Sequence, residues 1–569
     1  MFNPSIDHPR SPHRLALWDG LAGLLILISG TLIGATYAIG PTAWDDTLYL
    51  HTALTLTRDP TILNRYFHIA ILRLGILLEG GQPFAGAYLA GAFIFSLTAA
   101  LVYLNARLLS GASHPWHGIL ALFFLLATPY YLPNFGAILA DDTAMAMVSL
   151  GLLCFLLSIQ NEKFSPVALA LNGLIFFLAF KAKESSGALI LMLAALLFIR
   201  NTPFQPRILA GRALAILAGI AAGQLLWIAA DGVVLGDAWF GLRLADQQAL
   251  VAFNRLPMTS PRINGTYFNS LAQAGMLAPF CLSMLSAARR QASLKDGYWA
   301  VYLMPLIGYA GLILFESVQH FGVIDRYALP ALPVLAALAP QWIDFGGQDQ
   351  GVKPADRSLV SVAFGPAAIV LAVFLASVIL THWVAQSGAW QPADFVTTIL
   401  APLGVCLLLI GALTLPSGKT WGFLVLVGLS AFFALPLANV YRQDLVAGAT
   451  RQAAVNRLAP MTDFKPQVTC TSGQVFVSYN YYDHLDLLSR DQQSSNWMFD
   501  LAFNCSTQKS QFTLSSNLAE ILGKTFTYAF IPKMDFDALM QNPAQATALS
   551  QRYSISSDPQ QSYYLLSGK

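Results

Sequence analysis

The chain has 569 residues, of which 56% are hydrophobic and only 11% are charged. Soluble globular proteins carry about 25% charged residues, so this composition excludes an ordinary soluble protein. It favours an integral membrane protein, because side chains that face lipid need no polarity. The formal net charge of +2 is too small to indicate a nucleic-acid partner.

Apolar stretches recur along the chain, and a membrane span needs about 20 mostly apolar residues. The predicted spans are 15–39, 84–109, 118–132, 143–160, 166–182, 185–200, 212–230, 268–287, 298–315, 328–343, 362–384, 394–414 and 421–440. The expected fold class is therefore an all-α polytopic membrane bundle of about 13 transmembrane helices over residues 1–440. Membrane lipids are the expected partners of the outer surface of this bundle.

Lys and Arg in the short loops predict the orientation of the bundle. With the N-terminus in the cytoplasm, the inner loops collect most of these residues: Arg107, Lys163, Arg200, Arg207, Arg212, Arg289, Arg290, Lys295, Lys353, Arg357 and Lys419. An odd number of spans then places residues 441–569 on the extracytoplasmic side. In a bacterium the membrane would be the plasma (inner) membrane.

Two outer segments, 40–83 and 231–267, are too long to be simple connectors. The first holds Trp44-Asp45-Asp46 and then an amphipathic stretch through Arg65 and Arg73, which predicts short helices at the membrane interface. The second carries Arg243 and Arg255, and its prolines argue against a continuous helix.

Polar residues become frequent after residue 441, which predicts a small extracytoplasmic α/β domain over 441–569. Its clearest elements are a strand from Gln474 to Tyr482, a helix over 517–522 and a strand over 525–531. Cys470 and Cys505 are its two cysteines. A disulfide between them is plausible in an oxidising compartment, and two unpaired thiols are the alternative.

Two acidic pairs, Asp45-Asp46 and Asp141-Asp142, are predicted at the outer ends of membrane helices. The alternatives are solvated loop carboxylates for the first pair and helix capping for the second. Together the pairs could hold a hydroxyl acceptor, a divalent metal, or both. The carboxylates of Asp45 and Asp142 would permit Mg²⁺ or Mn²⁺ without requiring it.

Three basic residues, Lys181, Lys183 and Arg326, depart from the charge bias by lying at the outer surface. Lysines that snorkel from a helix end are the alternative interpretation. Basic side chains at this depth could instead bind the phosphate of a lipid and stabilise it as a leaving group.

These motifs resemble those of the GT-C fold glycosyltransferases, in the protein O-mannosyltransferase and aminoarabinose transferase branch. Trp44-Asp45-Asp46-x-x-Tyr49-x-x-x-Ala53 is similar to that family's Asp-Glu-x-x-Tyr-x-x-x-Ala signature, with Asp46 in place of the Glu. Asp142 and Lys183 resemble its second luminal Asp and a following Lys. The stretch from Arg326 to Pro333 is similar to its Arg-Tyr-x-Leu-Pro-x-x-Pro segment.

The resemblance implies transfer of a sugar, with inversion, from a polyprenyl-phosphate carrier to an extracytoplasmic acceptor that is a protein, a lipid or a glycan. Asp45 would be the general base, with Asp46 and Asp142 beside it. Lys183 and Arg326, with Arg243 or Arg255 from the long loop, would neutralise the departing phosphate. The loop 231–267 could close over the site.

Three other interpretations remain open. A transporter suits a chain with a dozen spans, but it would place its carboxylates near the bilayer midplane. A polymerase or ligase of lipid-linked oligosaccharides would rely on an Arg-rich outer loop, as 231–267 faintly suggests. An inactive relative that serves as a scaffold is the third.

Overall fold

The computed structural model describes residues 17–37, 44–56, 65–110, 115–126, 131, 139–160, 164–199, 205–239, 300–302, 329–342, 473–478, 511–515, 517–559 and 561–569, with the single positions 15, 283, 286, 464, 467, 468 and 470. The chain forms two compact units. The first comprises 1–30, 94–133 and 140–441, and the second comprises 31–93, 134–139 and 442–569.

Four described helices are long and apolar enough to cross a membrane: α1 (Leu17–Tyr37), α4 (Pro83–Leu109), α6 (Ala140–Gln160) and α9 (Pro206–Leu235). At 1.5 Å per residue, the shortest of them are about 32 Å long, which matches a bilayer core of about 30 Å. Large apolar side chains such as Leu214, Leu225 and Leu226 on α9 are exposed, as expected of a surface that faces lipid. The described part of the chain thus has a polytopic, membrane-type helical fold, while the full set of about 13 spans stays a prediction.

The shorter helices agree with the predicted spans to different degrees. The predicted span 118–132 overlaps α5 (Trp116–Leu126), and 166–182 matches α7 (Pro166–Ala182). The predicted helix 185–200 is wrong in its first part, because η3 (Glu184–Leu189) is a 3₁₀ helix and α8 (Ile190–Phe198) follows it. The run Ser185-Ser186-Gly187 explains the difference, since Ser and Gly are poor α-helix formers.

The remaining predicted spans are described only in part or not at all. The predicted span 328–343 contains α14 (Leu332–Leu338) followed by the 3₁₀ helix η5 (Ala339–Trp342), so it is not one regular α-helix in the structure. The predicted spans 362–384, 394–414 and 421–440 lie outside the described residues, as do nearly all of 268–287 and 298–315.

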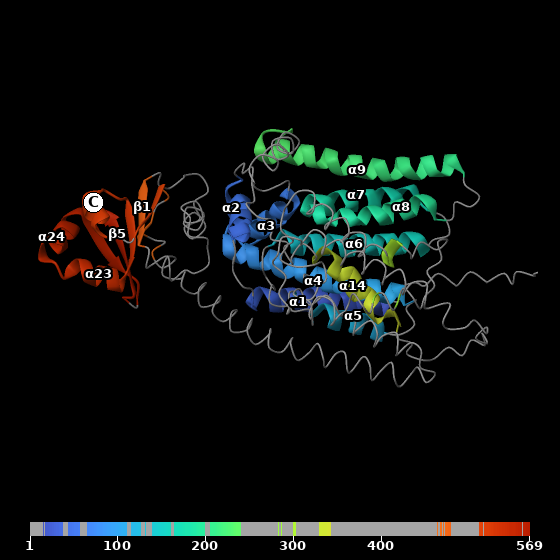
Figure 1. Ribbon diagram of the computed structural model, residues 1–569, viewed down its shortest axis with the longest axis horizontal. Coiled ribbons are helices and arrows are strands. Elements are labelled where there is room, and N and C mark those ends of the chain that lie inside the picture. Colours follow the sequence, from blue (N-terminus) through green and yellow to red (C-terminus); the bar gives the residue numbers. More distant parts are fainter. Residues whose placement is uncertain are drawn as a thin grey trace, which may run out of the picture. The chain divides into compact units, whose positions relative to one another are not determined.

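Helices α6, α7 and α9 lie side by side in the first unit (Figure 1). Small residues bring α7 and α9 together, because a Cβ added at Gly173 would collide with the carbonyl oxygen of Ile216, and one at Gly219 with that of Ala170. Only glycine allows the two backbones to approach this closely. The position of α7, which carries Lys181 and leads into Lys183, therefore depends on this contact.

We expect Gly219→Ala to lower the free energy of unfolding by about 1–3 kcal/mol, because the added methyl group must push α9 away from α7. Gly211→Ala is the matched control on the same helix, since a Cβ there meets nothing within 4 Å. The control should be neutral or stabilising by up to about 1 kcal/mol. Thermal unfolding of the two purified variants in detergent measures the difference, and equal midpoints would contradict the role of this contact.

The first long segment predicted outside the membrane includes the described helices α2 (Trp44–Thr55) and α3 (Tyr66–Leu78). Leu56, with φ of 53°, ends α2 in a left-handed conformation. Helix α3 packs closely on the start of α4, because a Cβ at Gly75 would meet the carbonyl oxygen of Gly86. These contacts fix α3 and thereby the arginines that it presents to α2.

The C-terminal region forms a five-stranded sheet in the order β2-β1-β3-β5-β4 (Figure 1). Strands β1 (Gln474–Ser478), β2 (Gln511–Ser515) and β3 (Tyr528–Pro532) are parallel. Strands β4 (Tyr553–Ser557) and β5 (Tyr563–Gly568) complete the sheet in antiparallel pairing. The described helices beside it are α22 (Ala519–Gly523), α23 (Lys533–Met540) and α24 (Pro543–Arg552).

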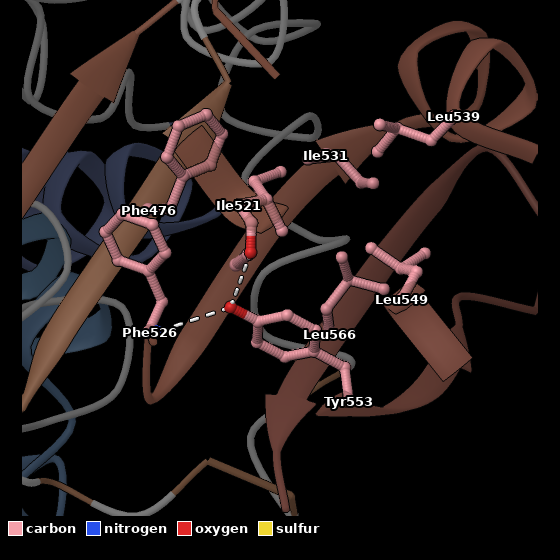
Figure 2. Close-up of a cluster of buried hydrophobic side chains, with 9 residues drawn as sticks. Phe476, Ile521, Phe526, Ile531, Leu539, Leu549, Tyr553 and Leu566 are labelled. Carbon is pink, nitrogen blue, oxygen red and sulfur yellow. Dashed lines mark hydrogen bonds between the residues drawn. The ribbon is translucent and has the colours of Figure 1, made fainter. Parts of the chain in front are cut away.

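One face of this sheet packs on the helices through a core that includes Phe476, Phe526 and Leu549. Figure 2 shows that the hydroxyl of Tyr553 lies inside this core, where it accepts a hydrogen bond from the backbone N–H of Phe526 (3.2 Å) and donates one to the carbonyl of Ile521 (3.1 Å). The buried phenol is thus satisfied, as a buried polar group must be. The predicted α/β architecture is confirmed in this region, although the predicted strand 474–482 is described only to Ser478.

Candidate functional site

The N-terminal end of α6 brings acidic and basic side chains together. Asp141 and Asp142 lie in its first turn, and Lys183 immediately follows the last residue of α7. Since α6 and α7 pack together and are joined by a short connection, they run in opposite directions, so the end of α7 lies beside the start of α6. There the Lys183 ammonium forms an ion pair with the Asp141 carboxylate, and both side chains are only 3% exposed.

This pair decides between the interpretations offered for Lys183. A snorkelling lysine keeps its ammonium in water, whereas this one is buried within the protein. Removing both charges from water costs several kcal/mol per ion, and good geometry only partly offsets that cost. An ion pair kept in such a place is a weak source of stability.

Tyr131 adds a second buried polar group near the start of α6. Its ring stacks on Phe95 with 3.8 Å between ring centroids, and its hydroxyl donates a hydrogen bond to the Phe95 carbonyl at 2.9 Å. Tyr131 lies close to the buried carboxylate of Asp142.

Helix α4 forms another wall of this cluster. Asn105 of α4 donates a hydrogen bond to the carbonyl of Ser149 on α6 at 2.8 Å. Tyr131, which is close to the charge of Asp142, donates a hydrogen bond to the Phe95 carbonyl on α4. Thr98 of α4 is buried, and its hydroxyl donates a hydrogen bond to the Ile94 carbonyl at 3.0 Å.

Lys181 is also buried, but it contacts a different group. Its ammonium lies 5.7 Å from the ring centroid of Phe177, in a cation–π contact within α7. Lys181 and Lys183 were both predicted at the outer surface, and the structure separates them: Lys183 pairs with an acidic residue of α6, while Lys181 lies over an aromatic ring of its own helix.

In the second unit, α2 begins at Trp44, so Asp45 and Asp46 lie in its first turn. Two further residues of the resembling motif, Tyr49 and Ala53, follow on the same helix and are buried. The Ala53 carbonyl accepts a hydrogen bond from Arg73 of α3. Asp45 belongs to the second unit and Lys183 to the first, and the expected approach of the two stays a prediction.

Other predicted site residues lie outside the described residues: Arg243, Arg255, Arg326 and Cys505. Their roles stay predictions. Cys470 is disulfide-bonded, and its pairing with Cys505 stays a prediction too. Among the described residues, no group of three or more His, Cys, Asp or Glu side chains could hold a metal ion.

Sequence reasoning missed the part that Asp141 plays. It singled out Asp142 and Lys183, whereas Lys183 contacts Asp141 in the structure. The spacing of these residues could have indicated this contact. Helices α6 and α7 form a hairpin, so the end of α7, where Lys183 lies, returns to the start of α6, where Asp141 lies. Tyr131 had no such signal, since its contacts depend entirely on tertiary packing.

Comparison with known proteins gives likenesses in structure only. No protein-family model matches the chain, and no curated protein matches its sequence. ArnT from Cupriavidus metallidurans bound to undecaprenyl phosphate is 16% identical, with a TM-score of 0.49, over 97% of both chains. The oligosaccharyltransferase AglB from Archaeoglobus fulgidus, in complex with an inhibitory peptide and a dolichol-phosphate, is 13% identical, with a TM-score of 0.40, over 96% of this chain and 74% of that one.

A third solved structure, the arabinofuranosyltransferase AftD from Mycobacteria, is 18% identical, with a TM-score of 0.36, over 65% of this chain and 27% of that one. The chain is similar to GT-C glycosyltransferases. These three proteins are of the kind that the motif resemblance predicts. Likenesses this distant assign no donor, acceptor or residue role, which must come from the residues themselves.

Proposed function

We propose that this protein is a membrane glycosyltransferase that moves a sugar from a polyprenyl-phosphate carrier to an acceptor hydroxyl outside the cytoplasm. The observation that supports this most is the buried Lys183–Asp141 pair beside Asp142 at the end of α6. An ammonium ion held at the end of an apolar helix bundle can receive the phosphate of a lipid whose chain lies in the bilayer.

The chemistry has a balanced course. The acceptor oxygen attacks the anomeric carbon from the face opposite the phosphate, a new carbon–oxygen bond forms, and the bond to the phosphate oxygen breaks with inversion. Asp45 takes the acceptor proton, and the phosphate leaves with the electron pair. Because a phosphate monoester is a stable anion, it needs charge compensation rather than an acid. Lys183 would supply this, with Arg326 and either Arg243 or Arg255.

Asp141 and Asp142 have different parts in this proposal. Asp141 neutralises Lys183 while no phosphate is bound, which keeps the ammonium charged although it is buried. Asp142, close to the buried Tyr131, contributes a carboxylate that can accept hydrogen bonds from sugar hydroxyls. We assign no step to a metal ion.

The transporter interpretation is less well supported by the described helices. In the four helices that could cross a membrane, each Asp, Glu, Lys and Arg lies within about two turns of a helix end. A transporter concentrates such residues near the midplane, where ions and substrates bind. Charged residues at the helix ends are better suited to chemistry at a bilayer surface than to transport through its centre.

The proposal is tested by a transfer assay in which purified protein is incubated with undecaprenyl-phosphate donors that carry mannose, glucose or arabinose. Mass spectrometry of lipids that purify with the protein guides the choice of donor. We expect release of undecaprenyl phosphate from one donor and, by NMR, a glycosidic product of inverted anomeric configuration. Failure to release the lipid phosphate from any donor, together with no bound polyprenyl lipid, would contradict the proposal.

A further inference from the structure

A buried hydroxyl follows the Lys183–Asp141 pair closely in the chain. Ser186 lies in η3 and is 1% exposed, and its side-chain oxygen has no hydrogen-bond partner in the part of the chain that the structure describes. Most buried hydroxyls do have such a partner, because a polar group without one loses its hydration and gains nothing in return. The hydroxyl of Ser186 is therefore a candidate for binding a ligand.

The backbone holds Ser186 close to Lys183. The backbone N–H of Ser186 donates a hydrogen bond to the Lys183 carbonyl at 3.0 Å. A turn closed by a bond between residues three apart keeps their Cα atoms within about 7 Å of each other. The side chains of Ser186 and Lys183 therefore start from the same turn of the backbone, just after the end of α7.

The face of η3 that carries Ser186 is turned toward α6. Side chains three residues apart on a 3₁₀ helix lie one above the other, so Ser186 shares this face with Leu189. Leu189 packs on α6, because a Cβ added at Gly151 would lie 3.3 Å from its Cδ1. At about 2 Å per residue, Ser186 precedes Leu189 by about 6 Å along η3, toward the ion pair that joins α7 to α6.

The direction of η3 indicates which part of a lipid-linked sugar Ser186 would meet. From Lys183, η3 leads into the apolar helix α8, whose first residue, Ile190, is 58% exposed, as expected of a side chain that faces lipid. Ser186 therefore lies on the bilayer side of Lys183. In a polyprenyl-phosphate sugar, the phosphate is on this side and the sugar extends away from the lipid chain.

A phosphate oxygen is a suitable acceptor for this hydroxyl. The ammonium of Lys183 is a point charge on a flexible stem, so it attracts a phosphate without fixing its orientation. A hydroxyl from the same turn adds a directional donor, and a hydrogen bond to a charged oxygen is about twice as strong as one between neutral groups. Such an acceptor also compensates for the burial of the hydroxyl.

We propose that the hydroxyl of Ser186 binds the phosphate of the polyprenyl carrier together with the ammonium of Lys183. The inference rests on the proposed function and deepens it, because it adds a residue to the phosphate site. The hydroxyl donates its hydrogen to one phosphate oxygen while the ammonium compensates the charge, so the phosphate is held in a defined orientation before it leaves.

The test compares lipid binding by the purified full-length protein and by Ser186→Ala, with native mass spectrometry to measure dissociation constants. The probes are undecaprenyl phosphate, undecaprenol, which lacks the phosphate, and inorganic phosphate, which lacks the lipid. We expect Ser186→Ala to weaken binding of undecaprenyl phosphate about 10-fold to 100-fold, the usual contribution of a hydrogen bond to a charged group. Undecaprenol should bind both proteins equally and more weakly than undecaprenyl phosphate.

Stability in the absence of lipid distinguishes this role from a structural one. Ser186→Ala should unfold at the wild-type temperature or slightly above it, because the hydroxyl that it removes has no partner within the described structure. Gly187→Ala is the matched control in the same 3₁₀ helix, since a Cβ there meets nothing within 4 Å. This control should bind undecaprenyl phosphate as the wild type does.

Equal binding of undecaprenyl phosphate by the wild type and Ser186→Ala would overturn this inference and leave the proposed function intact. A Ser186→Ala protein that does not fold, or that unfolds at a lower temperature, would show a structural role and overturn it too, as would an equal loss of binding in Gly187→Ala. Wild-type protein that binds inorganic phosphate as tightly as undecaprenyl phosphate would show a site for free phosphate instead. If undecaprenol binds the wild type as tightly as undecaprenyl phosphate, the proposed function itself fails.

Discussion

Replacement of Lys183 by Met lowers the free energy of unfolding by about 3–5 kcal/mol, because it leaves the Asp141 carboxylate buried without its counter-ion. Asp141→Leu alone leaves a buried ammonium and should cost a similar amount. The double variant, Lys183→Met with Asp141→Leu, should recover most of the stability, since a buried ion pair replaced by apolar side chains of similar volume is often neutral. Thermal unfolding in detergent gives the three values.

The same variants separate stability from catalysis. If Lys183 compensates the charge of the leaving phosphate, the double variant folds but does not transfer the sugar. Lys181→Met is the control, because that buried lysine contacts the Phe177 ring and should cost only about 0.5–2 kcal/mol without loss of transfer. A double variant that transfers at the wild-type rate would show that the pair is purely structural.

Asp45→Asn should reduce the rate of sugar transfer by about 10²–10⁴-fold, because an amide cannot accept the proton of the attacking hydroxyl. Asn is nearly isosteric with Asp, so the unfolding midpoint should change little. The measurement is the turnover rate with the undecaprenyl-phosphate sugar that the panel identifies, at saturating acceptor. Asp46→Asn, measured in parallel, shows which of the adjacent carboxylates is the base.

Glu79→Gln serves as the matched control for loss of a carboxylate in the same unit. Glu79 is exposed at the C-terminal end of α3, so its replacement should leave the transfer rate unchanged. Full activity in Asp45→Asn would refute the assignment of the base, and a deficit in Asp46→Asn alone would move the role to its neighbour.

Sequence reasoning succeeded where the signal is local. Hydropathy located α1, α4, α6 and α9, because a helix in lipid must be apolar over its whole length. It failed for β2, β4 and β5 of the C-terminal domain, since a short strand is specified mainly by the strands with which it pairs. The five-residue strand β2, for example, gains its place from its parallel register with β1.

By itself, the sequence determined that this is an integral membrane protein and that carboxylate and ammonium groups are located at the ends of its helices. Only the tertiary structure decided which of them meet. Asp141 and Asp142 are neighbours in sequence, but successive side chains of a helix point about 100° apart, so one pairs with Lys183 while the other faces Tyr131. That choice depends on the rotation of α6 against α7 and α4, which the packing of their faces sets and local composition does not encode.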